Sequence, residues 1–172
     1  GNVKVMSQGW SMTPFLKGDI EVASAMVYNE YHVVLASGVR QDELNVIDYA
    51  DYNLGFPGDV LFTTQETAAT NPELCTSMVR ASLRGWQYAM DHPDEAVDTV
   101  LKYDRSGVQT RSHQLAMMKE VTQLIRVPGR RIGHLDDARL ASMIKLLLQY
   151  GILKSQLDLK EIFTGAFLEE IK

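Results

Sequence analysis

The feature that most constrains the fold is a change of pattern at Asn71. Before this residue, strand-like and helix-like segments alternate, whereas the later segments have apolar residues at helical spacing. Asn71 is a good N-cap residue and Pro72 suits the first helical position, so the pair predicts a long amphipathic helix over residues 72–92. The pair His92-Pro93 repeats this start signal. The last two thirds of the chain are therefore expected to be helical.

The first third of the chain predicts strands as well as helices. Four segments have strand-like apolar patterns, at residues 3–8, 20–26, 43–49 and 59–64. Two short helices are expected between them, at residues 13–19 and 29–38, closed by Gly18 and Gly38. The fold class is therefore predicted as α/β, with largely parallel strands and a helix-rich C-terminal part.

The helical part contains four more predicted segments. Residues 93–103, 110–125 and 136–151 are expected to be helices, and Gly151 ends the last of them. The tail, residues 157–172, is expected to add a helical turn or two. No internal repeat and no low-complexity tract interrupts this order.

Composition narrows the possible function classes. A chain of 172 residues is long enough for one domain with a hydrophobic core. Its net charge of −5 argues against nucleic acid, which needs clustered Lys and Arg to neutralise phosphate. The single cysteine, Cys75, excludes an internal disulfide and a multi-cysteine zinc site. The sequence contains neither a membrane-spanning apolar run nor an N-terminal leader, and any export signal could lie upstream of these residues.

Three polar side chains stand where the predicted strand 20–26 passes into a helix: Tyr28, Asn29 and Glu30. Ligands of open α/β sheets bind outside the carboxyl ends of strands, at such junctions. Glu30 could accept hydrogen bonds from an amino group, Asn29 could donate and accept, and Tyr28 could stack on a flat ring. The alternative is purely structural: Asn29 caps the helix and Glu30 favours its positive end.

Two further aromatic residues are candidate ligand contacts. Trp10 follows the first predicted strand and could form a wall of a cleft, with packing into a core as the alternative. Tyr52 lies in the turn-rich segment 50–58 and could reach a ligand, although Asn, Gly and Pro there are ordinary loop residues. Both are therefore predicted as ligand-binding residues beside Tyr28, Asn29 and Glu30.

Signals for catalysis are absent from the sequence. The four histidines do not have the spacing of metal ligands, and no nucleophile elbow, phosphate-binding loop or dinucleotide fingerprint occurs. We therefore predict no enzyme activity, no catalytic residue, no metal and no cofactor.

The order of elements resembles the C-terminal half of a type II periplasmic solute-binding protein, of the branch that binds thiamine-pyrimidine precursors. The matching segments are "FLKGDIEVASAMVYNE", "DVLFTT", "NPELCTSMVRASLRGWQYAMDHPDEAV" and "IFTGAFLEEI", which together span nearly the whole chain. The resemblance implies an aromatic residue and a glutamate at the ligand, which correspond to Tyr28 and Glu30. The family's usual spacing of four would instead place Met26 at the aromatic position.

The resemblance also implies two α/β lobes with the ligand between them. Residues 1–64 correspond to most of lobe two, and residues 65–172 correspond to helices that return to lobe one. A parallel sheet has both faces buried and needs neighbouring strands. Isolated strands would leave open edges, so we expect exposed apolar surface or self-association of this part of the fold.

The function implied by the resemblance is delivery of a small heteroaromatic or amino-bearing solute to an ABC permease in the periplasm. The alternative is a ligand-sensing domain of a signalling protein with the same fold, in which lobe closure shifts an equilibrium. A third reading is a purely structural helical domain. A fungal branch that makes the thiamine pyrimidine needs a histidine and a cysteine-rich segment that this chain does not display.

Overall fold

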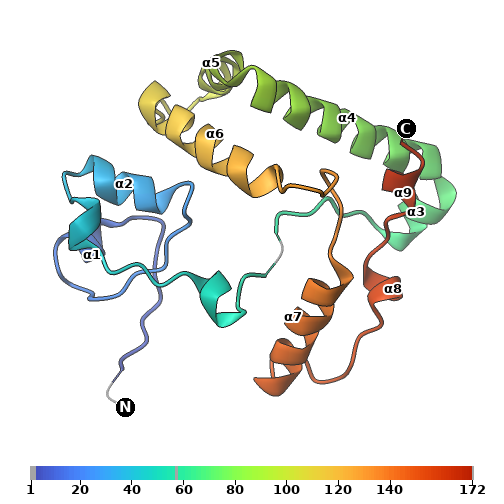
Figure 1. Cartoon of the computed structure of the whole chain (residues 1–172), viewed down its shortest axis with the longest axis horizontal. Helices are drawn as coiled ribbons and strands as arrows, with labels where there is room; N and C mark the ends of the chain where they lie inside the picture. The colour runs from blue at the N-terminus through green and yellow to red at the C-terminus, as the bar shows by residue number, and fades with distance from the viewer. Residues whose placement is uncertain (1–2, 57, 172) are drawn as a thin grey trace. The chain divides into compact units, whose positions relative to one another are not determined.

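A computed structural model describes residues 3–56 and 58–171 (Figure 1), and the chain divides into two compact units. The first unit comprises Gly1–Asn45 and Ala89–Arg126, and the second unit comprises Val46–Tyr88 and Val127–Lys172. Each unit thus combines a stretch from the first part of the chain with a later helical stretch. The predicted lobes, residues 1–64 and 65–172, refer to the complete two-lobed fold, and that division stays a prediction.

The first unit is built around helix α6 (Arg111–Ile125), which packs against α5 (Pro93–Tyr103) and α2 (Glu30–Ala36). Two shorter helices, α1 (Thr13–Leu16) and η1 (Gln41–Glu43), belong to the same unit. Arg111 joins α6 to α5 through ion pairs with Asp94 at 2.6 Å and Asp98 at 3.0 Å. The buried apolar residues of this unit include Val34 on α2 and Val97 on α5. This packing places the start of α2, where the predicted ligand-binding residue Glu30 lies, beside α6.

The second unit contains most of α4 and the C-terminal helices. Its elements are η2 (Tyr49–Tyr52), α3 (Gln65–Thr70), α4 (Pro72–Asp91), α7 (Asp137–Gln149), α8 (Leu159–Ile162) and α9 (Ala166–Glu169), with the last residues of α4 belonging to the first unit. Thr76 on α4 is buried, and its hydroxyl donates to the Glu170 carboxylate at 2.7 Å. Gly133 has a φ of +84°, and a side chain there would meet Leu83 at 3.2 Å. Within residues 3–56 and 58–171, no helix has the length and apolar character needed to cross a membrane.

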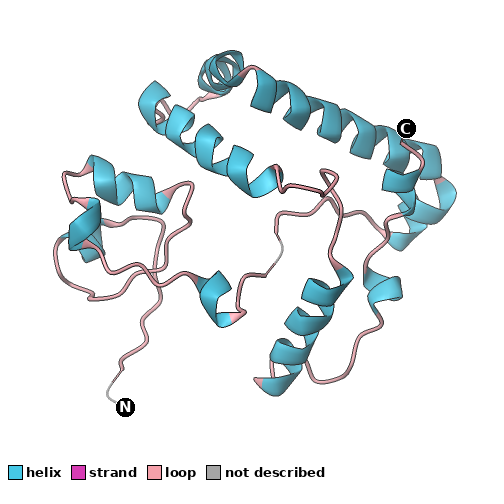
Figure 2. Ribbon diagram, viewed as in Figure 1, coloured by secondary structure: helices cyan, strands magenta, loops and turns pink. Residues whose placement is uncertain are grey.

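The helical part of the prediction is confirmed (Figure 2). Helix α4 begins at Pro72 and α5 at Pro93, each immediately after its predicted start signal. The Thr110 hydroxyl caps α6 by accepting from the backbone N–H of His113. Gly18, Gly38 and Gly151 follow helix ends with positive φ angles, a conformation that glycine adopts without steric cost. Helix α3 was not predicted.

The strand part of the α/β prediction is not confirmed, because the described residues contain no strand. A strand needs the backbone N–H and C=O groups of a neighbouring strand, and the segments at 3–8, 20–26, 43–49 and 59–64 meet no such ladder. At Ser24, the side-chain amide of Gln8 forms the two hydrogen bonds that a neighbouring strand would otherwise form with the backbone. The Gln8 amide donates to the Ser24 carbonyl at 2.7 Å and accepts from the Ser24 N–H at 2.8 Å.

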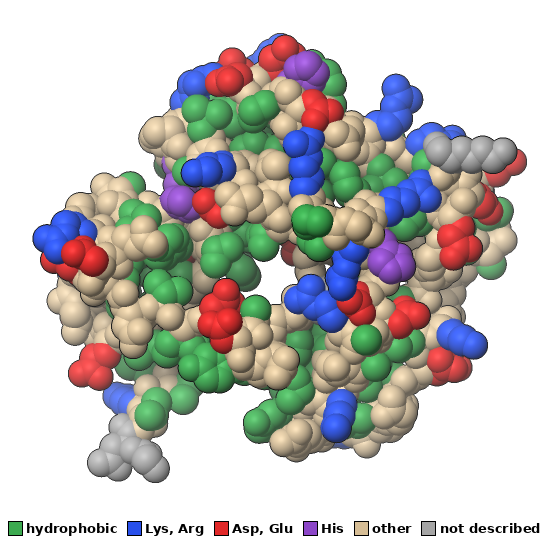
Figure 3. All heavy atoms as spheres, in the orientation of Figure 1, with side chains coloured by type: hydrophobic (Ala, Val, Ile, Leu, Met, Phe, Trp, Pro, Cys, Tyr) green, Lys and Arg blue, Asp and Glu red, His purple; other side chains and the backbone are tan. Residues whose placement is uncertain are grey.

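The apolar side chains of the expected strands are exposed. Val5 is 90% exposed and Phe62 is 93% exposed, and Val3, Val22, Val46 and Leu61 are exposed as well. Hydrophobic side chains reach the surface at many places on the face drawn in Figure 3. This agrees with the expectation of exposed apolar surface, whereas self-association stays a prediction.

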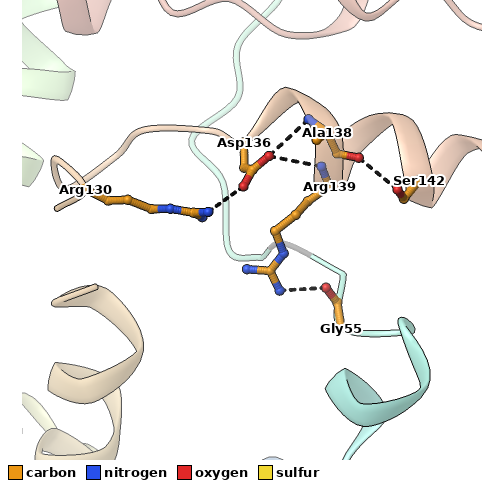
Figure 4. A network of polar contacts seen from close by, with 6 residues as sticks. All are labelled: Gly55, Arg130, Asp136, Ala138, Arg139 and Ser142. Carbon is orange, nitrogen blue, oxygen red and sulfur yellow. Dashed lines mark hydrogen bonds and ion pairs between the residues drawn. The ribbon is translucent and has the colours of Figure 1, made fainter. Parts of the chain in front are cut away.

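Asp136 is the N-cap residue of α7 and also forms an ion pair with Arg130 (Figure 4). Its Oδ1 accepts from the backbone N–H groups of Ala138 at 3.0 Å and Arg139 at 3.2 Å. Its Oδ2 pairs with the Arg130 guanidinium at 2.6 Å. The Arg139 guanidinium in turn donates to the Gly55 carbonyl at 2.9 Å. The backbone N–H of Arg139, and then Arg130, hold the pKa of Asp136 below its ordinary value.

This depressed pKa predicts acid sensitivity of the second unit. The unfolded chain binds a proton at Asp136 more readily than the folded chain, so the stabilisation is complete above about pH 3.9 and is lost as pH falls through the lower folded pKa. Asp136→Asn keeps an acceptor oxygen but loses the charge. We expect it to be less stable than the wild type near neutral pH, with a difference that shrinks on acidification.

The measurement is urea unfolding of both proteins in steps from about pH 7 to about pH 2. Asp137→Asn is the matched control, since it removes the same charge one residue away from the cap. An equal loss of stability in the two variants, or a difference that does not depend on pH, would contradict the role given to Asp136.

Candidate ligand-binding site

The segment from Met26 to Glu30 forms a tight turn into α2. The backbone N–H groups of Asn29 and Tyr31 both donate to the Met26 carbonyl, at 3.1 and 3.3 Å. The Glu30 carboxylate turns back on the preceding segment, and its Oε2 accepts from the Met26 N–H at 2.9 Å. As the first residue of α2, Glu30 also carries its charge at the favourable end of the helix.

Asn29 stands at the N-cap position but does not cap α2 with its side chain. Its Nδ2 donates to Glu30 Oε1 at 3.2 Å, and its Oδ1 lies 2.9 Å from Nε2 of His113 on α6. The capping role considered for Asn29 is therefore wrong, because both ends of the amide are engaged with other side chains. Asn29 instead connects the start of α2 to α6.

His113 was missed by the sequence reasoning. It lies 84 residues after Asn29, and no local signal indicates that α6 passes beside this turn. An amide oxygen accepts and does not donate, so the hydrogen of this contact belongs to Nε2 of His113. His113 is half-buried, as are Asn29 and Glu30. The structure thus brings together two of the predicted residues and adds a third group.

A second histidine lies at the same helix pair. Nε2 of His32 on α2 is 3.8 Å from Oε1 of Glu120 on α6, and among the described residues that buried nitrogen has no hydrogen-bond partner. The ring of Tyr31 meets the His32 ring edge-on, with centroids 5.7 Å apart. The contact between His32 and Glu120 joins α2 to α6, whereas the ring contact lies within α2.

The three predicted aromatic contacts differ in their surroundings. Tyr28 is half-buried in the turn itself. Trp10 is 98% exposed, so the alternative that it packs into a core is wrong for the described structure. Tyr52 belongs to η2 of the second unit and is 64% exposed. Ligand contact by each of these residues stays a prediction.

The polar groups at this turn can bind a neutral or cationic ring edge. Asn29 keeps one amide N–H beyond the bond to Glu30, and each carboxylate oxygen of Glu30 keeps a lone pair. One donor and one acceptor are thus offered side by side. In the part of the chain that the structure describes, no group of three acidic, histidine or cysteine side chains could hold a metal ion.

Cavities away from this turn are lined by described residues of each unit. One of about 540 Å³ in the second unit is lined by residues that include Arg130, Arg131 and His134. The other, of about 470 Å³ in the first unit, is lined by Val100, Tyr103, Asp104 and neighbouring residues. The hydroxyl of Ser106 holds the pKa of Asp104 below its ordinary value. Neither cavity is lined by a predicted ligand-binding residue.

Comparison with known sequences identifies the class of protein. The sequence model of the family described as NMT1/THI5 like matches residues 2–96, more than half of the chain, and the chain belongs to this family. The fold of the family is the type II periplasmic binding fold. The family predicted from the sequence is thereby confirmed, and it indicates a solute-binding protein.

A curated relative is the riboflavin-binding protein RibY of Chloroflexus aurantiacus. The two are 28% identical over 178 residues, which cover 97% of this chain and 48% of the relative. The chain thus spans about half the length of this curated relative. No solved structure matches the chain.

Proposed function

We propose that this chain is part of an extracytoplasmic solute-binding protein that carries a flat heteroaromatic molecule to an ABC permease. Family membership supports the binding role, and the name of the relative supports a flavin as the first ligand to test. A thiamine-type aminopyrimidine is the second ligand, because its ring carries a similar pattern of donors and acceptors. Transport distinguishes this proposal from a sensor, which would bind the same ligand without a permease.

The observation that carries the proposal is the polar group at the start of α2. Glu30 and Asn29 offer an acceptor and a donor at a half-buried turn, and among the described residues each keeps bonding capacity beyond the hydrogen bonds that it forms. Ring systems such as the flavin or an aminopyrimidine carry adjacent N–H and acceptor atoms on one edge. Tyr28 and Trp10 are the proposed stacking contacts for the ring, and Tyr52 of the second unit stays a predicted ligand contact.

The test is the substitution Glu30→Gln in the full-length protein, with riboflavin as the probe. A charge-assisted hydrogen bond to a ligand is worth roughly 1.5–3 kcal/mol, so the affinity should fall by about 10- to 150-fold. A carboxylate that only favours a helix end contributes about 0.3–1 kcal/mol to stability. We therefore expect a large change in the dissociation constant and a small change in the unfolding midpoint.

The dissociation constant is measured from riboflavin fluorescence and by calorimetry, beside a thermal unfolding curve. Glu21→Gln is the matched control, because Glu21 is exposed in the same unit and loses the same charge. A change in affinity below about threefold, with an equal loss of stability, would return Glu30 to a purely structural role. Absence of binding by the wild type to riboflavin and to the aminopyrimidine would overturn the proposed function itself.

A further inference from the structure

Three hydrogen bonds at the start of α2 form a group that ends on the Glu30 carboxylate. Nε2 of His113 donates to Asn29 Oδ1 at 2.9 Å, and Asn29 Nδ2 donates to Glu30 Oε1 at 3.2 Å. The backbone N–H of Met26 donates to the other carboxylate oxygen at 2.9 Å. Each oxygen of the Glu30 carboxylate therefore accepts one hydrogen bond, one from Asn29 and the other from Met26.

The orientation of the Asn29 amide depends on His113. If the amide were rotated by half a turn, its oxygen would face the negatively charged Glu30 oxygen at 3.2 Å, and its NH₂ group would face the N–H of His113. The contact with Glu30 would then be repulsive, and so would the contact with His113 as long as its hydrogen stays on Nε2. His113 thus makes the observed orientation the better one, with the second amide N–H of Asn29 available beside the carboxylate.

We propose that His113 is a positioning residue for the ligand site, which fixes Asn29 as donor and Glu30 as acceptor. This inference rests on the proposed function. The resulting pair recognises a ring edge on which an acceptor and a donor are neighbours, such as C=O beside N–H in riboflavin or ring N beside NH₂ in an aminopyrimidine. His113 acts through Asn29 and has no direct contact with the ligand.

The first experiment measures riboflavin affinity of the full-length protein with His113→Ala, Asn29→Ala and the double variant. Loss of one orienting hydrogen bond should weaken binding by roughly 3- to 10-fold for His113→Ala. In the Asn29→Ala background, the same change at His113 should have little further effect, because its route to the ligand is already gone. Additive losses would overturn the positioning role.

His113→Gln provides the rescue variant, since its side-chain amide can donate to Asn29 Oδ1 as the imidazole does. We expect its affinity to lie closer to the wild type than to His113→Ala, with similar unfolding midpoints for the two variants. Equal affinities of the glutamine and alanine variants would show that His113 only supports packing of α2 on α6. His134→Ala, on the second unit, is the control and should bind as the wild type does.

The ligand provides an independent arm. Riboflavin methylated at N3 lacks the ring N–H that would donate to Glu30, so it should bind at least about tenfold more weakly than riboflavin. In the Glu30→Gln variant, the difference in affinity between riboflavin and its N3-methylated form should be smaller than in the wild type. Equal affinities of the wild type for the two flavins would overturn the proposed hydrogen bond from the flavin N3–H to Glu30.

A readout without ligand separates the two proposals. Nitrogen-15 NMR of the histidine rings should show the hydrogen of His113 on Nε2 near neutral pH, and the signal should change in Asn29→Ala. A hydrogen on Nδ1 with none on Nε2 would overturn the positioning role, whatever the protein binds. If riboflavin binds and Glu30→Gln weakens it, but His113→Ala does not, the proposed function stands and the positioning role fails.

Discussion

Replacing Leu140 by alanine is expected to lower the free energy of unfolding of the second unit by about 2–5 kcal/mol. Leu140 is 1% exposed on the inner face of α7, one turn before the buried Ile144. Truncation removes apolar contacts and leaves a cavity that the surroundings fill only in part. The loss should be severe in this chain, because few of its described apolar residues are buried as deeply.

Urea unfolding, followed by circular dichroism at the helical band, gives the measurement. Leu74→Ala is the matched control, since Leu74 lies on a helix of the same unit and is 61% exposed. Its substitution should change the free energy of unfolding by no more than about 0.5 kcal/mol. Equal losses at the two positions would show that α7 does not hold its core through Leu140.

Replacing Trp10 by alanine is expected to weaken riboflavin binding by roughly 2–4 kcal/mol, the range of a dominant aromatic contact. An aromatic side chain that is 98% exposed contributes little to packing, so the unfolding midpoint should hardly change. Stacking of a flavin on an indole ring also quenches flavin fluorescence. The Trp10→Ala variant should therefore lose part of the quenching that accompanies binding.

Trp86→Ala is the matched control for this prediction. Trp86 lies on α4 in the second unit and is not among the proposed ligand contacts. Its loss should leave the riboflavin affinity within about twofold of the wild type. If Trp10→Ala binds riboflavin as tightly as the control, Trp10 is a surface residue without a role in the site.

The helices could be predicted because their signals are local. Pro72 and Pro93 mark helix starts within a few residues of the groups they affect, and Gly38 and Gly151 mark helix ends in the same way. The strands could not be predicted as reliably. An apolar pattern such as that of residues 59–64 shows only that a strand would be stable beside neighbours, and the pairing itself depends on other parts of the fold.

The candidate site was predictable only in part. The run Tyr28-Asn29-Glu30 indicated a polar junction, and the structure places Asn29 and Glu30 in one hydrogen-bonded group. The role of Asn29 was misjudged, since capping statistics describe neighbours along the chain and His113 arrives from a distant helix. Which end of an amide faces a ligand is decided by such remote contacts.

The contact between Gln8 and Ser24 has a consequence for aggregation. Extended apolar segments with open backbone groups are templates on which another chain can add as a strand. At Ser24 both backbone groups are already taken by the Gln8 amide. A second chain that paired there would first have to displace two short hydrogen bonds. We therefore expect Gln8 to hinder the pairing of a second chain with this segment at Ser24.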